Sequence, residues 1–421
     1  MSTPPAPVSP GTSARATPDA VARRARLAVA ALFLTNGALF ANVVPRFPSI
    51  KAELGLSNAA YGLAIAAFPT GAILAGLGAA VVIRRLGSAR AAVIGTVITA
   101  VGVVAVGWSP SALAFGAALL FAGSADAITD VAQNTHGLRV QRRYGRSIIN
   151  SFHALWSIGA VTGGAMAAAA IALDVPRGVH LSISGVLLSA TAIVALRFCL
   201  PGPDTERDAE LADAPATTSR VRARIGGRTA LILLALVVVA TAGTLVEDAG
   251  SSWAAVYLGG LGAPEALAAT GFIALVGAQF VGRACGDRLV DRFGQRAVAR
   301  VGGGLAALGM GLALAFPSVP GTIVGFATAG LGVATLVPAA MHEADELPGL
   351  RTGTGVTIVS WLMRLGFLVS PPIVGLVADA TSLRVGLLVV PIAGVAALVL
   401  ARVFSTRRTA ATTATAADVE A

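Results

Sequence analysis

The sequence predicts an all-α membrane protein with 12 transmembrane helices in two pseudo-symmetric six-helix bundles. Its composition, the spread of its apolar residues and a polar break near mid-chain lead to this prediction. Of the 421 residues, 55% are hydrophobic and only 12% are charged, whereas about a quarter of the residues of a soluble domain are charged. The apolar residues recur from Leu27 to Phe404 and are not confined to one block. These features argue against a soluble enzyme and exclude a soluble domain carried on a single membrane anchor.

Each element follows from its local composition. Residues 1-26 are rich in Pro, Ser, Thr and Ala and contain no apolar run, so we expect a disordered cytoplasmic tail. An N-terminal six-helix bundle is predicted over 27-200, since about 20 helical residues cross the hydrocarbon core. Residues 201-228 are polar, charged and Pro-containing, which is typical of a flexible cytoplasmic linker. A second six-helix bundle is predicted over 229-404 and a disordered cytoplasmic tail over 405-421. The apolar segments are 27-45, 59-82, 89-107, 112-135, 148-171, 179-199, 229-250, 266-286, 297-316, 321-342, 354-376 and 384-404.

The arginines predict the orientation of these helices. They are concentrated in the two tails, in the linker and in every second loop, whereas the other loops hold only Arg46, Lys51, Arg177 and Arg384. Positively charged loops stay in the cytoplasm, so we expect a multi-pass protein of the inner (plasma) membrane with both termini cytoplasmic. The net charge of +10 is then a topology signal, and no nucleic-acid partner is expected.

The two halves of the sequence resemble each other. Arg85-Leu86-Gly87 matches Arg292-Phe293-Gly294 at an offset of 207 residues. The same offset relates glycines in two further helix pairs, Gly123 with Gly330 and Gly159 with Gly366. A parallel repeat of two six-helix halves is typical of transporters that rock their halves around a central site.

These features together resemble the major facilitator superfamily. The loop after the eighth segment, Asp291-Arg292-Phe293-Gly294, is similar to the signature of that family between its second and third helices, although Asp287 stands at the leading Gly position. The first copy has Arg84 in place of the Asp and Ala80 in place of the leading Gly. The resemblance implies a gating role for the residues of both loops, which are Arg85, Gly87, Arg90, Asp287, Asp291, Arg292 and Gly294.

Within the superfamily, the fourth and fifth segments look most like the fucose-permease-like and rhizopine-transport (MosC-like) branch. The similarity lies in the run from Asp130 to Asn134 and in Gly145-Arg146 with the polar residues that follow. The fifth segment lacks the Gly-Pro pair of the antiporter signature, since residues 159-164 read GAVTGG. This absence weighs against drug efflux by proton antiport.

Polar residues inside the predicted spans are candidates for the functional site, because a charge at the bilayer centre costs about 2.5–3.5 kcal/mol on insertion scales. Asp126, Asp130 and Asn134 follow one another at four-residue spacing, which places them on one helix face. Two carboxylates close together in a poorly hydrated site favour the uptake of a proton by one of them. We therefore expect Asp130, helped by Asp126, to couple transport to protons, and Asn134 to bind substrate. The structural alternative is that both acids pair with loop arginines.

The fifth and first segments supply further substrate-binding candidates. Asn150 and His153 are predicted at a depth comparable with that of Asp130, and Trp156 shares a face with His153. An aromatic ring beside amide and carboxylate groups suits a sugar or polyol. The alternative for this pair is a packed Trp and a His bonded to backbone. In the first segment we favour Asn36, near mid-membrane, over Asn42, which lies on another face.

The second half adds acids and a lone cation. Glu247 and Asp248 are adjacent, so only one of them is expected to face the cavity, and Glu247 is the predicted substrate-binding residue. Trp253 and Tyr257, which follow at helical spacing, are interpreted as an interfacial aromatic belt. Arg364 lies mid-segment with Trp361 one turn before it. An Arg at that depth needs water or an acid, so both residues are predicted to line the central cavity.

The sequence thus predicts a secondary active transporter that works by alternating access. The resemblance implies symport of protons with a small polar solute, such as a sugar, a polyol or an amino-sugar derivative. The alternatives are a proton-antiport exporter of drugs or metabolites, and a sensor or flippase on the same fold. No enzyme activity, cofactor or metal site is expected, because phosphate-loop and metal-ligand spacings are missing from the sequence. The expected partners are the solute, protons and the lipid bilayer, with the chain acting as a monomer.

Overall fold

The computed structural model describes residues 19–145, 148–202, 226–348, 350 and 354–404. These residues form α-helices and short 3-10 helices, without a β-strand among them. Twelve helical segments are long and apolar enough to cross a membrane. The predicted fold class is therefore confirmed.

Six spans come from the first half of the chain. The first span consists of α1, η1 and α2, whereas the second is α3 alone, which a turn separates from the short helix α4. The elements are α1 (Ala20–Val43), η1 (Val44–Arg46), α2 (Phe47–Glu53), α3 (Asn58–Gly76), α4 (Ala79–Leu86), α5 (Ser88–Gly107), α6 (Ala112–Tyr144), α7 (Ile149–Ala172) and α8 (Arg177–Leu196).

The second half repeats this plan with its own breaks. Its elements are α10 (Gly227–Gly260), α11 (Glu265–Ala268), α12 (Thr270–Phe293), α13 (Gln295–Ala315), α14 (Val319–Val333), α15 (Leu336–Asp345), α16 (Thr354–Ala380), α17 (Leu383–Gly386), α18 (Val389–Leu400) and η2 (Ala401–Val403).

Several helices are longer than their predicted apolar segments, and α1 and α10 are two examples. Helix α1 begins at Ala20, so residues 20–26, expected in the disordered tail, are helical instead. The side chain of Asp19 caps this helix by accepting a hydrogen bond from the backbone N–H of Ala22 at 2.6 Å, which satisfies a donor left free at a helix start. Helix α10 continues ten residues past its predicted end, to Gly260. Hydropathy thus predicts the apolar part of each of these helices but not the helical residues that continue beyond it.

The repeat is present in the packing of the two halves. A Cβ on Gly123 would collide with the carbonyl oxygen of Phe68, and a Cβ on Gly330 would collide with that of Leu275. Phe68 and Leu275 are themselves 207 residues apart, so the same backbone contact recurs at the predicted offset. Small residues let helix backbones approach this closely. The offset read from three loop and glycine matches therefore reflects a structural repeat.

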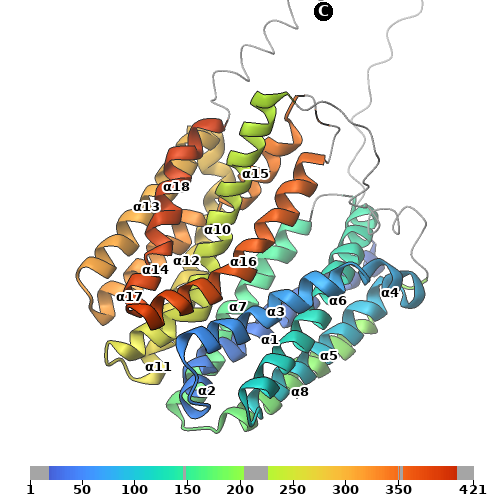
Figure 1. The fold of residues 1–421 in the computed structure, drawn as a ribbon. Helices are drawn as coiled ribbons and strands as arrows, with labels where there is room; N and C mark the ends of the chain where they lie inside the picture. The colour runs from blue at the N-terminus through green and yellow to red at the C-terminus, as the bar shows by residue number, and fades with distance from the viewer. Residues whose placement is uncertain (1–18, 146–147, 203–225, 349, 351–353, 405–421) are drawn as a thin grey trace, which may run out of the picture.

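The halves meet along a seam in which α3 packs against α16 and α7 packs against α12. We call the end at which α1 begins and η2 ends the termini face and the opposite end the far face. Figure 1 shows the two bundles converging at the far face, near α2 and α11, and diverging toward α4 and α15.

Hydrogen bonds across the seam lie at the far face. The carboxylate of Asp379, at the end of α16, accepts from the backbone N–H groups of Asn58 and Ala59 at 2.9 and 2.8 Å. The hydroxyl of Tyr61 donates to the carbonyl oxygen of Ser252 at 2.6 Å. Polar contacts that join described residues to one another at the termini face, such as that of Arg143 with Asp19, stay within one half. The structure is thus closed at the far face.

Candidate functional site

A chain of hydrogen bonds links three of the predicted residues in the first half. The indole N–H of Trp156 in α7 donates to Oδ1 of Asn36 in α1 at 2.8 Å. The amide of Asn36 donates in turn to Oδ1 of Asp126 in α6 at 2.7 Å. Asn36 is only 5% exposed, and its one side chain holds both partners in place. These hydrogen bonds therefore join three separate helices, α1, α6 and α7, at this site.

Asp130 lies one turn further along α6 and is held by neighbours on its own helix. Its Oδ1 accepts from Asn134 at 3.0 Å and from Gln133 at 3.4 Å. Although Asp130 lies mid-helix, its side chain is exposed. It forms no ion pair within 4 Å with any cation of the described residues, but it lies in the electrostatic range of His153 and of Arg364 from the other half. Asp126 and Asp130 also act on each other.

His153 is exposed on α7 and is oriented by an aromatic neighbour. The ring of Phe33 meets it edge-on, with 5.2 Å between centroids and an angle of 81°. The side chain of His153 is therefore accessible and is not buried in the core. The side chain of Asn150, predicted at the same depth, lies outside the described residues.

The second half contributes Glu247, which is partly buried in α10. Its Oε2 accepts from the amide of Gln279 in α12 at 2.9 Å and lies 3.6 Å from Nη2 of Arg283. Gln279 is 3% exposed, whereas Arg283 is 40% exposed at its side chain and acts electrostatically on His153 across the seam. Of the two adjacent acids, Glu247 is thus the one directed toward this polar region.

Arg364 is exposed in the middle of α16, facing the first half. A Cβ added to Gly76 of α3 would lie 3.9 Å from its Nη1. Trp361, one turn earlier, is 52% exposed. Among the described residues, Arg364 acts electrostatically on Asp130 without forming an ion pair within 4 Å. The two halves therefore present opposite charges to each other toward the termini face.

Asp248 points elsewhere and is 6% exposed. Trp253 is fully buried, and Tyr257 is 6% exposed. The prediction of an interfacial aromatic belt at these two positions is therefore wrong. The ring of Trp253 packs edge-on against Tyr61 of α3, with 5.0 Å between centroids. The two aromatic residues of α10 face protein rather than lipid because α10 runs through the inter-half contact.

The predicted gating residues occupy equivalent turns of the two halves. Gly87 and Gly294 end α4 and α12 with φ of 79° and 84°, a backbone conformation that glycine adopts without steric cost. The guanidinium of Arg292 stacks over the ring of Phe293 at 5.5 Å. The charged residues of both turns are exposed at the termini face, which leaves their gating role a prediction. They are Arg85, Arg90, Asp287, Asp291 and Arg292.

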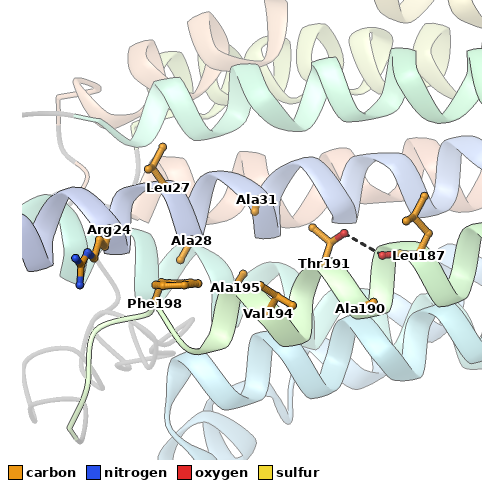
Figure 2. A pocket seen from close by; sticks show the side chains of 10 residues that line it. All are labelled: Arg24, Leu27, Ala28, Ala31, Leu187, Ala190, Thr191, Val194, Ala195 and Phe198. Carbon is orange, nitrogen blue, oxygen red and sulfur yellow. Dashed lines mark hydrogen bonds between the residues drawn. The ribbon is translucent and has the colours of Figure 1, made fainter.

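A hollow of about 560 Å³ lies between α1 and α8, away from these residues (Figure 2). Its lining is apolar except for Arg24 and Thr191, and the hydroxyl of Thr191 already donates to the carbonyl oxygen of Leu187 at 2.9 Å. Leu27 and Phe198 on its walls are 72% and 46% exposed. This surface suits contact with lipid tails rather than with a polar solute.

Several residues that form hydrogen bonds at the site or across the seam were not predicted from the sequence. Gln133 and Gln279 donate hydrogen bonds to the acids Asp130 and Glu247. Asp379 lay beyond the predicted end of its segment. Its position could have indicated a role, because an acid in the last turn of a helix is disfavoured by the helix dipole. Such an acid is expected to accept a hydrogen bond from another element.

The sequence matches the Major Facilitator Superfamily over residues 29–289 and 261–420. It is 29% identical over 381 residues to an uncharacterized transporter, y4wD, of Sinorhizobium fredii, covering 89% of this chain and 97% of that protein. It is also 29% identical over 370 residues to the membrane protein MosC of Rhizobium meliloti, covering 87% of each. The whole chain is thus comparable with these relatives.

Solved structures share the fold at low sequence identity. The nucleoside transporter NupG superposes with a TM-score of 0.69 at 13% identity, covering 89% of this chain and 97% of that one. A D-xylose-proton symporter superposes with a TM-score of 0.68 at 18% identity, covering 90% and 95%.

Proposed function

Because this chain belongs to the major facilitator superfamily, in its MosC-like branch, we propose that it is a proton-coupled symporter of a small polar solute. As a member of this family it is a multi-pass membrane transporter with 12 candidate spans. We propose further that the termini face is cytoplasmic, since most arginines lie there, and that the chain works as a monomer in the inner membrane. The structure then corresponds to an inward-open state.

One observation supports proton coupling above all others. Asp130 is a mid-helix carboxylate that is exposed and has no ion-pair partner within 4 Å in the described part of the chain. A group in this position exchanges protons with water and changes the charge that faces His153 and Arg364. Protonation of Asp130 therefore weakens the attraction between the two halves on the termini side, which biases the equilibrium between inward-open and outward-open packing.

The residues around Asp130 suit a hydroxyl-rich or amino-sugar-like solute. Carboxylates, amides and an imidazole from Asp126, Asn134 and His153 supply both donors and acceptors. Trp156 provides an apolar ring held by Asn36, and Arg364 approaches from the opposite half. A D-xylose-proton symporter of the same fold takes a solute of this class.

The test is solute accumulation in proteoliposomes. Purified protein is first screened by ligand-dependent thermal shift against sugars, polyols, amino sugars and antibiotics, and the best ligand is then used for transport. Asp130→Asn should abolish accumulation driven by a pH gradient while sparing exchange of the solute across the membrane. Asp174→Asn, which alters an exposed acid at the far face, is the control.

Normal gradient-driven accumulation by Asp130→Asn would overturn the coupling assignment. Accumulation driven by an inverted gradient would indicate antiport, and ligand binding without any flux would indicate a sensor.

A further inference from the structure

A second acid, Asp248, lies buried where the two halves meet and has no part in the site described above. It is 6% exposed in α10. Tyr61 of α3, which is fully buried, lies within its electrostatic range and donates its hydroxyl to the carbonyl oxygen of Ser252, one turn after Asp248. The contact between Tyr61 and Trp253 covers the same region. Asp248 is thus sealed from water by a contact that exists only while the far face is closed.

Only one of the two carboxyl oxygens of Asp248 has a hydrogen-bond partner. Oδ1 accepts from the hydroxyl of Ser252 at 3.1 Å, while Oδ2 is buried without a partner. The hydroxyl of Ser370 in α16 is 1% exposed, has no partner either, and lies close enough to act on Asp248. Among the described residues, the Ser370 hydroxyl is the one donor that adjoins Oδ2 of an ionised Asp248, whereas a protonated Oδ2 can itself donate to the Ser370 oxygen.

The charges around Asp248 do not compensate a buried carboxylate. The charged group that acts on it from its own helix is the carboxylate of Glu247, of the same sign. The arginines of the adjoining helices are engaged elsewhere: Arg283 of α12 faces Glu247, and Arg364 of α16 acts on Asp130. Asp379 of α16 caps α3. The ionised form of an uncompensated buried acid is strongly disfavoured, and such a group neutralises instead.

We propose that Asp248 is a second proton-binding site, which holds a proton while the far face is closed and releases it when that face opens. Opening separates α3 from α10 and admits water to the carboxyl group, whose O–H bond then breaks to give a carboxylate and a proton in the water of the far side. Closing requires the reverse step. This inference rests on the proposed function in that it assigns the far face to the proton-rich side, and it makes binding of a proton a condition for closing.

The proposal is tested by measuring the far-face distance as a function of pH. Spin labels are attached at exposed positions of the two halves, Ala60 and Leu267, after replacing the free cysteines Cys199 and Cys285 by serine. The measurement is made in the Asp130→Asn background, so that the other acid cannot contribute. The ratio of open to closed far face should rise with pH, by up to about tenfold per pH unit for one linked proton.

Adding Asp248→Asn should leave the far face closed at every pH, because Asn is neutral and has nearly the shape of the protonated acid. Asp174→Asn, added instead, should leave the pH dependence unchanged. A distance that is independent of pH before Asp248 is changed would overturn the proposal, as would a pH dependence that survives Asp248→Asn. Since no transport is measured, either result is distinguishable from a failure of coupling at Asp130.

Infrared spectroscopy gives a direct second readout. The closed state should show the carbonyl stretching band of a protonated carboxyl group, and this band should be missing from Asp248→Asn and present in Asp174→Asn. A spectrum that Asp248→Asn does not alter would show that the buried acid is ionised, which contradicts the proposal.

Discussion

The carboxylate of Asp379 at the end of α16 caps the start of α3 at Asn58, bonding both its backbone N–H and its side-chain amide at 2.9 Å. The first N–H groups of a helix have no partner within the helix, and a negative charge is favoured at that end. The cap joins two residues that are 321 positions apart in the sequence and belong to opposite halves of the transporter.

Asp379→Ala should open the far face. Losing the carboxylate removes hydrogen bonds that join α16 to α3 at an exposed contact, and water then satisfies the freed N–H groups equally well with the far face open. We expect a several-fold increase in the open population, read as faster labelling of a cysteine placed at Ser252, which is 4% exposed in the closed state. Asp174→Asn, which changes an exposed acid on the same face and keeps a residue suited to the positive φ at this position, is the control. Equal labelling rates in the two variants would contradict the prediction.

Asn36→Leu should weaken substrate binding. The substitution leaves the indole N–H of Trp156 and Oδ1 of Asp126 without their shared partner, and an unsatisfied group costs about 1–3 kcal/mol. We expect about a tenfold rise in Kd, measured by titration of the ligand against tryptophan fluorescence. Thr35→Val is the matched control, since the hydroxyl of the adjacent Thr35 bonds only to its own helix. An unchanged Kd in Asn36→Leu would show that Asn36 does not contribute to substrate binding.

Gly123→Val and Gly330→Val should each lower stability. Both glycines lie against a carbonyl oxygen of the neighbouring helix, and a backbone cannot rotate away as a side chain can. Overpacking of this kind costs about 1–3 kcal/mol, which should appear as a lower Tm in detergent. Gly116→Val in the same helix α6 has open space around it and should melt like the wild type. A similar Tm for all four proteins would mean that the helices are not locked at these points.

Asp19→Asn should lower Tm at neutral pH but not in acid. The backbone N–H of Ala22 and then the guanidinium of Arg143 hold the pKa of Asp19 below its ordinary value of 3.8. Since the folded state binds the proton less tightly, the stabilisation is present above about pH 3.8 and is lost as the pH falls through the lowered pKa. The difference in Tm between the two proteins should therefore vanish below that pH. If the difference in Tm persists in strong acid, the stabilisation by Asp19 comes from packing rather than from its charge.

The sequence predicts most of this fold because hydropathy, loop charge and the repeat each depend on local residue type. The 12 spans and the 207-residue offset follow from such patterns, as does the set of polar residues around Asp126 and Asp130. The contacts across the seam do not follow from local patterns, because they depend on whether the two halves are open or closed at the far face. Trp253 was expected to face lipid, since nothing local shows that Tyr61, 192 positions away in the sequence, covers it.

The seam itself is nearly free of side chains at two points. A Cβ on Gly62 of α3 would collide with the carbonyl oxygen of Pro371, and one on Gly375 of α16 would collide with that of Asn58. At these points the two helices are therefore in direct backbone contact. One half can rotate against the other here without separating interlocked side chains. The hydrogen bonds at the far face are then what holds the closed arrangement.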